Sequence, residues 1–382
     1  MSVLATIAMV LATLPAQVEF PVSVATSVYL WGGGATPMGE LADATDERVE
    51  IKLSGDAEVV VGWERVRDIR GPRAQEFSAS LDRGRDAWRA GQRLLRDDPI
   101  FAEPLLEAIA RSDPGDGYGE TSAFIDEALV RCRVQRGAFE LAIQPWLRLV
   151  ASGRLPGPAR LAGVAPLTDA RSALVPRLAP FWVPGLATPS ASESDPVESV
   201  GGAIKALFEE SRRAAAAADG VDASVVRSAI DAWRDEPDVA FLGEVVLASA
   251  SSAEARRDAR DRLSKYEFDE AAPAAERWRE AWVGIAIGSS LLMERTDTER
   301  IEGALELVTV RVSFEGAYPY LSGVALARAA LGMRSLGYDD DARTLVRDLR
   351  STFPSHPALD WVAVREIDAG GVDPAGTIED DL

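Results

Sequence analysis

The chain has 382 residues, of which 47% are hydrophobic, and its formal net charge is −20 at pH 7. This composition supports a large core, and the length predicts about two or three domains or one extended repeat array. The negative charge repels phosphate backbones, and the arginines are scattered among acidic residues rather than clustered, so we expect no nucleic-acid binding. The single cysteine, Cys132, excludes an intrachain disulfide.

Residues 1–16 carry no charged side chain and contain an apolar run of signal-peptide length, which is too short to span a bilayer. We predict a signal peptide cleaved after Ala16 and therefore a periplasmic or otherwise exported protein. The segment lacks the usual basic start, and Leu14 stands where a small residue is typical. The alternative is a cytoplasmic protein with a buried N-terminal segment. No later run has the length of a transmembrane helix, so we predict no integral membrane span in the mature chain.

The region 18–71 has the pattern of a small β domain. Short segments with alternating, often β-branched residues are separated by glycine and aspartate, and they cover 22–30, 38–41, 49–53, 58–61 and 63–69. This spacing predicts a small barrel or a curled sheet whose core is closed by Trp63, Val66 and Ile69. The order of these segments resembles that of Sm-like small barrels. The asparagine and glycine motifs with which Sm proteins bind RNA are absent, so this resemblance does not imply RNA binding.

Helical patterns follow from residue 73 onward and form two predicted blocks, 73–186 and 197–367. The predicted helices cover 79–95, 101–113, 121–136, a partner containing Trp146 and Leu149, 200–219, 223–235, 239–251, 253–266, 274–295, 298–312, a hairpin at 322–354, and 357–367. Prolines interrupt long helices between 155 and 189. The polar stretch 187–196 is predicted to be a linker, and the acidic tail 368–382 is predicted to be disordered.

Three predicted hairpins share the residue intervals of one repeat family. A small residue, a large residue four positions later and an apolar residue three further on recur as Ala102, Leu106 and Ile109 and as Ala342, Val346 and Leu349. Turn glycines precede two of these second helices at Gly137 and Gly337, and prolines close two units at Pro114 and Pro354. These features resemble tetratricopeptide (TPR) repeats, whose period is about 34 residues. Leu326 and Ala330 replace the tryptophan and glycine that the family has in its first helix, and Arg154 replaces one closing proline.

The resemblance implies an α-solenoid of helical hairpins whose first helices line a concave surface that binds a protein or peptide. Carried over to this sequence, the candidate surface residues are Glu127, Arg131, Gln135, Arg328, Leu331 and Arg334. The chain contains no asparagine, so the asparagine-based clamp that some family members use for carboxylates cannot form.

Catalytic and metal-binding patterns are not found in the sequence. His356 is the only histidine and Cys132 the only cysteine, which excludes a structural zinc site in a monomer. Cys132 lies in an apolar helical pattern and is predicted to be a buried, unreactive thiol. The glycines at 32–34 lack the spacing of a phosphate loop. We therefore predict no metal, no cofactor and no enzymatic activity.

Taken together, the sequence predicts a non-catalytic protein- or peptide-binding scaffold of the bacterial cell envelope. One alternative is an envelope carbohydrate-binding protein or a glycan-acting enzyme, with sugar stacking on Trp31, Trp63, Trp146 and Trp182. A second alternative is a structural subunit of a larger envelope assembly, as a homo- or hetero-oligomer.

Overall fold

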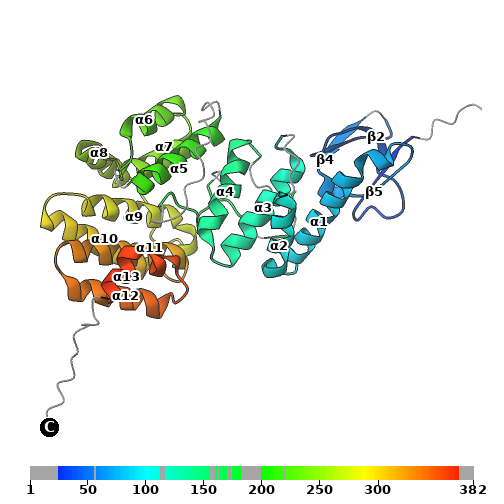
Figure 1. Cartoon of the computed structure of the whole chain (residues 1–382). Helices are drawn as coiled ribbons and strands as arrows, with labels where there is room; N and C mark the ends of the chain where they lie inside the picture. The colour runs from blue at the N-terminus through cyan, green and yellow to red at the C-terminus, as the bar shows by residue number, and fades with distance from the viewer. Residues whose placement is uncertain are drawn as a thin grey trace, which may run out of the picture. The chain divides into compact units, whose positions relative to one another are not determined.

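The computed structural model (Figure 1) describes residues 25–55, 57–111, 117–154, 160–161, 163–164, 166–169, 172, 174–181, 199–217 and 220–369. The predictions for the leader 1–16, for the linker 187–196 and for all but the first two residues of the tail 368–382 lie outside these residues. The chain is mainly helical, with a small antiparallel sheet in its N-terminal part. It divides into two compact units, formed by residues 1–88 with 114–121 and by residues 89–113 with 122–382.

The first unit contains an open five-stranded sheet with the order β4-β3-β2-β1-β5. The strands are β1 (Ser27–Leu30), β2 (Gly39–Ala44), β3 (Val49–Lys52), β4 (Glu58–Val61) and β5 (Val66–Arg70). All pairings are antiparallel, and one turn of 3-10 helix, η3 (Trp63–Arg65), joins β4 to β5. Because β1 pairs with both β2 and β5, strands β4 and β5 become the two edges. The described strands therefore form an open sheet, and the closed barrel, which was one of the two predicted forms, is wrong.

The core of this unit is centred on Trp63. Trp63, Val66 and Ile69 are all buried, as the sequence predicted. The indole N–H of Trp63 donates to the carbonyl of Thr45 at 2.8 Å, and its backbone N–H donates to the hydroxyl of Thr121 at 2.8 Å. The Thr121 hydroxyl in turn donates to the carbonyl of Glu47 at 3.0 Å. The segment around residue 121 therefore closes the sheet unit although it lies far along the chain.

The rest of the described chain consists mainly of helices, and consecutive helices from α4 to α13 contact one another. They are α1 (Ser78–Leu94), α2 (Pro99–Arg111), α3 (Glu120–Gln135), α4 (Phe139–Ala151), α5 (Val200–Ala217), α6 (Ala223–Ala232), α7 (Pro237–Leu247), α8 (Ala253–Leu263), α9 (Trp278–Leu292), α10 (Asp297–Phe314), α11 (Pro319–Ser335), α12 (Asp339–Thr352) and α13 (Val362–Ala369). Short 3-10 turns precede α1, α9 and α13, namely η4 (Ala74–Phe77), η5 (Ala274–Glu276) and η6 (Pro357–Asp360).

Each observed α-helix lies near a predicted one, although the predicted helix 357–367 is η6 followed by α13, and the described residues between 169 and 179, where a short helix was also expected, form none. Figure 1 shows α9 to α13 side by side, in yellow to red, with α13 in contact with both α11 and α12. Local signals explain several of the helix ends. Thr296 caps α10, for example, by accepting from the backbone N–H of Glu299 at 3.2 Å while its hydroxyl donates to the Glu299 carboxylate at 2.6 Å.

Three turns between consecutive helices have the same backbone geometry. Their central residues, Asp97, Gly137 and Gly337, have positive φ angles of 59°, 81° and 83°. In each turn the following N–H donates to the carbonyl five residues before it: Asp98 to Arg93 at 3.0 Å, Ala138 to Arg133 at 2.8 Å, and Tyr338 to Met333 at 3.0 Å. This arrangement is the Schellman end of a helix, which favours glycine at its centre. The turn glycines predicted at 137 and 337 are therefore confirmed, and Asp97 adopts the same conformation.

Small residues allow these helices to approach closely. The predicted contact residues Ala102, Ala330 and Ala342 are all fully buried. One such close approach joins α9 to α10, where a Cβ added to Gly303 would lie 2.6 Å from the carbonyl oxygen of Gly288. The two helix backbones are thus in direct contact at this point, and no side chain fits between them.

We predict that Gly303→Ala lowers the free energy of unfolding by about 1–3 kcal/mol, the usual cost of overpacking a core. Alanine forms helix better than glycine by up to about 1 kcal/mol, but a rigid carbonyl facing the new methyl outweighs that gain. Urea denaturation followed by circular dichroism measures the change. Gly316→Ala is the matched control, because a Cβ at Gly316 meets no atom within 4 Å. Equal stability of the two variants would show that α9 and α10 do not pack this closely.

Candidate functional site

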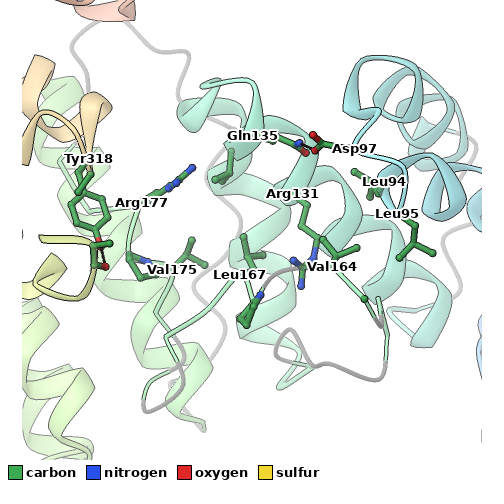
Figure 2. Close-up of a pocket in the computed structure, with 16 residues that line it drawn as sticks. Leu94, Leu95, Asp97, Arg131, Gln135, Val164, Leu167, Val175, Arg177 and Tyr318 are labelled. Carbon is green, nitrogen blue, oxygen red and sulfur yellow. Dashed lines mark hydrogen bonds between the residues drawn. The ribbon is translucent and has the colours of Figure 1, made fainter. Parts of the chain in front are cut away.

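A cleft of about 520 Å³ lies within the helical unit (Figure 2). Its walls come from the C-terminal end of α1, one face of α3, the segment 163–177, η5 and the turn between α10 and α11. The residues that line it are Leu94, Leu95, Asp97, Arg131, Val134, Gln135, Gly163, Val164, Pro166, Leu167, Val175, Pro176, Arg177, Ala275, Ala317 and Tyr318. Most of these side chains are apolar, and the ionisable groups among them are two arginines, one aspartate and one tyrosine.

A buried carboxylate holds Arg131 in the cleft wall. The Glu127 side chain is fully buried, and its Oε1 accepts from Nη2 of Arg131 at 2.7 Å and from Nε at 3.1 Å. Its other oxygen, Oε2, accepts from Nη1 of Arg160 at 3.2 Å. One buried carboxylate therefore holds two guanidinium groups in place through charge-assisted hydrogen bonds.

Arg177 supplies a second cation from the opposite side. Its side chain is exposed, and within the described residues it forms no ion pair or hydrogen bond. Figure 2 shows the guanidinium reaching into the space between Tyr318 and α3. An exposed arginine on an apolar wall is free to bind an anionic ligand bidentately.

Asp97, the acidic residue that lines the cleft, already accepts a hydrogen bond from a neighbouring side chain. The Gln135 amide donates to the Asp97 carboxylate, as the dashed line in Figure 2 shows. Asp97 is also the residue with a left-handed backbone in the turn after α1. Glycine occupies the matching position in the two other turns. Asp97 replaces glycine in this turn, and its side chain lines the cleft.

Tyr318 and Cys132 are held in unreactive states. The Tyr318 hydroxyl donates to the carbonyl of Ala275, and burial raises its pKa to about 12. Burial likewise raises the pKa of the Cys132 thiol to about 12, with the nearby Glu103 carboxylate adding to the effect. Neither group is ionised near neutral pH, so neither provides a nucleophile.

A second cavity, of about 130 Å³, shares Arg177, Ala317 and Tyr318 with the cleft. Its floor is formed by aromatic rings, since Phe139, Tyr318 and Tyr320 are all buried. The Phe139 and Tyr320 rings are 4.3 Å apart, and the Tyr320 hydroxyl lies 3.0 Å from Oε1 of Glu140. These contacts join the start of α4 to the start of α11.

His356 supports Tyr320 from the other side. Its Nε2 lies 2.9 Å from the Tyr320 carbonyl, and its Nδ1 accepts from the backbone N–H of Ala358 at 3.1 Å. This pair of contacts requires the neutral tautomer with the proton on Nε2, which donates to the carbonyl. Burial lowers the pKa of His356 to about 4, although the hydrogen bond to Tyr320 opposes that shift.

The structure brings three of the six predicted surface residues together. Arg131 and Gln135 line the cleft, and Glu127 lies directly behind Arg131. The other three are on α11 and do not line it. There Arg334 pairs with Glu366 of α13 at 3.2 Å, the Arg328 guanidinium lies 5.9 Å from the centre of the Phe181 ring with its pKa lowered by burial to about 10, and Leu331 is half-buried.

Arg177 and Tyr318 were not predicted from the sequence. The family resemblance implies site residues on first helices, and these two residues lie outside the regular helices. One signal was present: Arg177 is the only charged residue between positions 172 and 192. An isolated cation in an apolar, proline-rich stretch is a reasonable indicator of a binding role.

The tryptophans that were predicted to stack on sugars lie in different surroundings. Trp63 and Trp146 are fully buried and expose no face. Trp31 stacks on Trp88 with ring centres 3.9 Å apart, so one of its faces is covered. Trp182 lies outside the described residues. Among the described residues, no cluster of His, Cys, Asp and Glu is suited to a metal ion, and no helix is long and apolar enough to cross a membrane.

Comparison of the chain with models of protein families, with curated proteins and with solved structures gave no match.

We predict that Glu127→Gln lowers the free energy of unfolding by about 3–5 kcal/mol, because two guanidinium groups then lose their shared buried counter-charge. Chemical denaturation measures the loss. The control is Glu267→Gln, which changes an exposed glutamate in the loop after α8. If Glu127→Gln were as stable as Glu267→Gln, the carboxylate would not be holding the cleft wall.

His356 is expected to make stability depend on pH. Its folded pKa of about 4 lies below the ordinary value of 6.5, so its contribution is complete above pH 6.5 and is lost as the pH falls toward 4. Between about pH 7 and about pH 5 this group should cost roughly 2 kcal/mol.

The measurement is urea denaturation of the native chain and of His356→Gln at both pH values. The native chain should lose about 2 kcal/mol more than the variant between the two values, because all carboxylates contribute equally to both proteins. An equal loss in the two proteins would contradict a buried neutral imidazole.

Proposed function

We propose that the protein is a non-catalytic protein- or peptide-binding scaffold of the bacterial cell envelope, and that the cleft is where its partner binds. The observation that carries this proposal is the exposed guanidinium of Arg177, which has no ionic partner among the described residues and stands in an otherwise mostly apolar wall. Ligand sites are typically concave and largely apolar, with a small number of polar groups that fix orientation.

The ionisable groups of the cleft favour binding over catalysis. Arg131 is held by Glu127, Asp97 accepts a hydrogen bond from Gln135, and the Tyr318 hydroxyl donates to the carbonyl of Ala275. None of the groups that line the cleft forms the paired base and nucleophile that acyl or glycosyl transfer requires. The remaining capacity is that of Arg177 to bind an anion and of the apolar lining to bury a ligand.

The TPR-like architecture is part of the same proposal. Three hairpin turns share one backbone geometry, and the small residues at the family positions are buried at helix contacts. Both features support helical hairpins that bury their faces against neighbours. The strand order of the sheet, with one 3-10 turn before its last strand, is compatible with the resemblance to Sm-like domains. A signal peptide at 1–16 would deliver the chain to the envelope.

We predict that proteins captured from a cell-envelope extract by the native chain are lost when Arg177→Glu reverses the charge in the cleft. Quantitative mass spectrometry of the eluates measures the loss. Arg234→Glu is the matched control, since Arg234 is a highly exposed arginine whose side chain retains 71% of its accessible surface. An unchanged set of captured proteins in Arg177→Glu would remove the cleft as the binding site, and an empty eluate from the native chain would argue against the scaffold function.

A further inference from the structure

We infer that the ligand is a peptide segment in which a large apolar side chain lies within two positions of an aspartate or glutamate. The apolar side chain enters the 130 Å³ cavity beside the cleft, and the carboxylate binds Arg177. This inference rests on the proposed function and names the chemistry of the partner.

The small cavity fits one ring-sized group. Its floor is made of the buried rings of Phe139, Tyr318 and Tyr320, while Gly316 and Pro319 form an exposed rim. A cavity of about 150 Å³ lined by apolar side chains is large enough to bind benzene. A cavity of 130 Å³ therefore has room for a phenyl or leucyl side chain but not for a folded element. Aromatic rings on the floor favour an aromatic occupant through edge-to-face contacts.

The floor is rigid enough to select by shape. Tyr320 is held by the Glu140 carboxylate at its hydroxyl and by His356 at its carbonyl. Tyr318 is held at its hydroxyl by Ala275. Side chains whose positions are fixed by their own hydrogen bonds preorganise a pocket, which lowers the entropic cost of binding.

Arg177 determines the charge that the bound peptide must carry and the position of that charge along the peptide. It lines both the cleft and the small cavity, so a ligand that fills the cavity passes directly beside the guanidinium. The other cation of the cleft, Arg131, is already paired with Glu127. An extended peptide advances about 3.3 Å per residue, so a carboxylate one or two positions from the buried side chain can reach Arg177. A lysine or arginine at that place would be repelled.

The experiment is a selection of random decapeptides displayed on phage against the immobilised full chain. We expect enrichment of peptides in which Phe, Tyr, Trp, Leu or Met stands within two positions of Asp or Glu. The best peptide is then synthesised in three forms: as selected, with its acid replaced by the amide, and with its large apolar residue replaced by alanine. Each replacement should weaken binding about 10-fold or more, measured by fluorescence anisotropy.

Three variants of the chain complete the test. Arg177→Glu should bind the amide peptide better than the acidic one, because its carboxylate repels the acid. Arg177→Lys should retain a preference for the acid, and Arg234→Glu should bind like the native chain. Enriched peptides without such a residue pair, or an acid preference that survives Arg177→Glu, would overturn this inference and leave the scaffold function standing. If no peptide at all is enriched, the peptide-binding function fails with it.

Discussion

The close approach of consecutive helices is the constraint on which the helical unit depends. Consecutive helices from α4 onward contact one another, so their shared faces must fit together without intervening bulk. Alanines at 102, 330 and 342 and the paired glycines of α9 and α10 meet this requirement. Schellman turns with one shared backbone geometry join α1 to α2, α3 to α4 and α11 to α12. The larger apolar side chains of each helix then fill the space that remains between the helices.

The same constraint explains why the cleft is built mainly from irregular segments. Where helices pack in direct contact, their shared faces leave no space for a ligand. Pro166 and Pro176 prevent a long helix beside α3, and Glu315 and Gly316 in the turn between α10 and α11 are exposed. Space therefore opens beside α3, and the side chains that meet there come from positions that no helical pattern relates. Glu127 has no route to solvent in this arrangement, so its charge serves to hold Arg131 and Arg160 in place.

The sequence indicated the helical elements because their signals are local. Periodicity, capping residues and turn glycines act within a few positions of one another, and they placed α1 to α12 near their observed bounds. It did not indicate that Thr121 would close the sheet unit, since the bond to Trp63 spans 58 residues. It also did not indicate that Arg177 would face Tyr318, because only tertiary packing brings 163–177 to the turn at 318. The family resemblance directed attention to α11, whose arginines instead contact α13 and Phe181.

The net charge of the chain affects the distance at which Arg177, the exposed arginine of the cleft, attracts an acidic partner. A net charge of −20 repels an acidic partner at long range, but salt at physiological strength screens such repulsion beyond about 8 Å. An acidic peptide is then attracted only after it has come within a few ångströms of the guanidinium, where screening is weak. Burial of the neighbouring apolar side chain supplies favourable free energy at the same distance. In the proposed binding mode, recognition therefore depends on both contacts forming together, and Arg177 allows this because it lines both the cleft and the aromatic cavity.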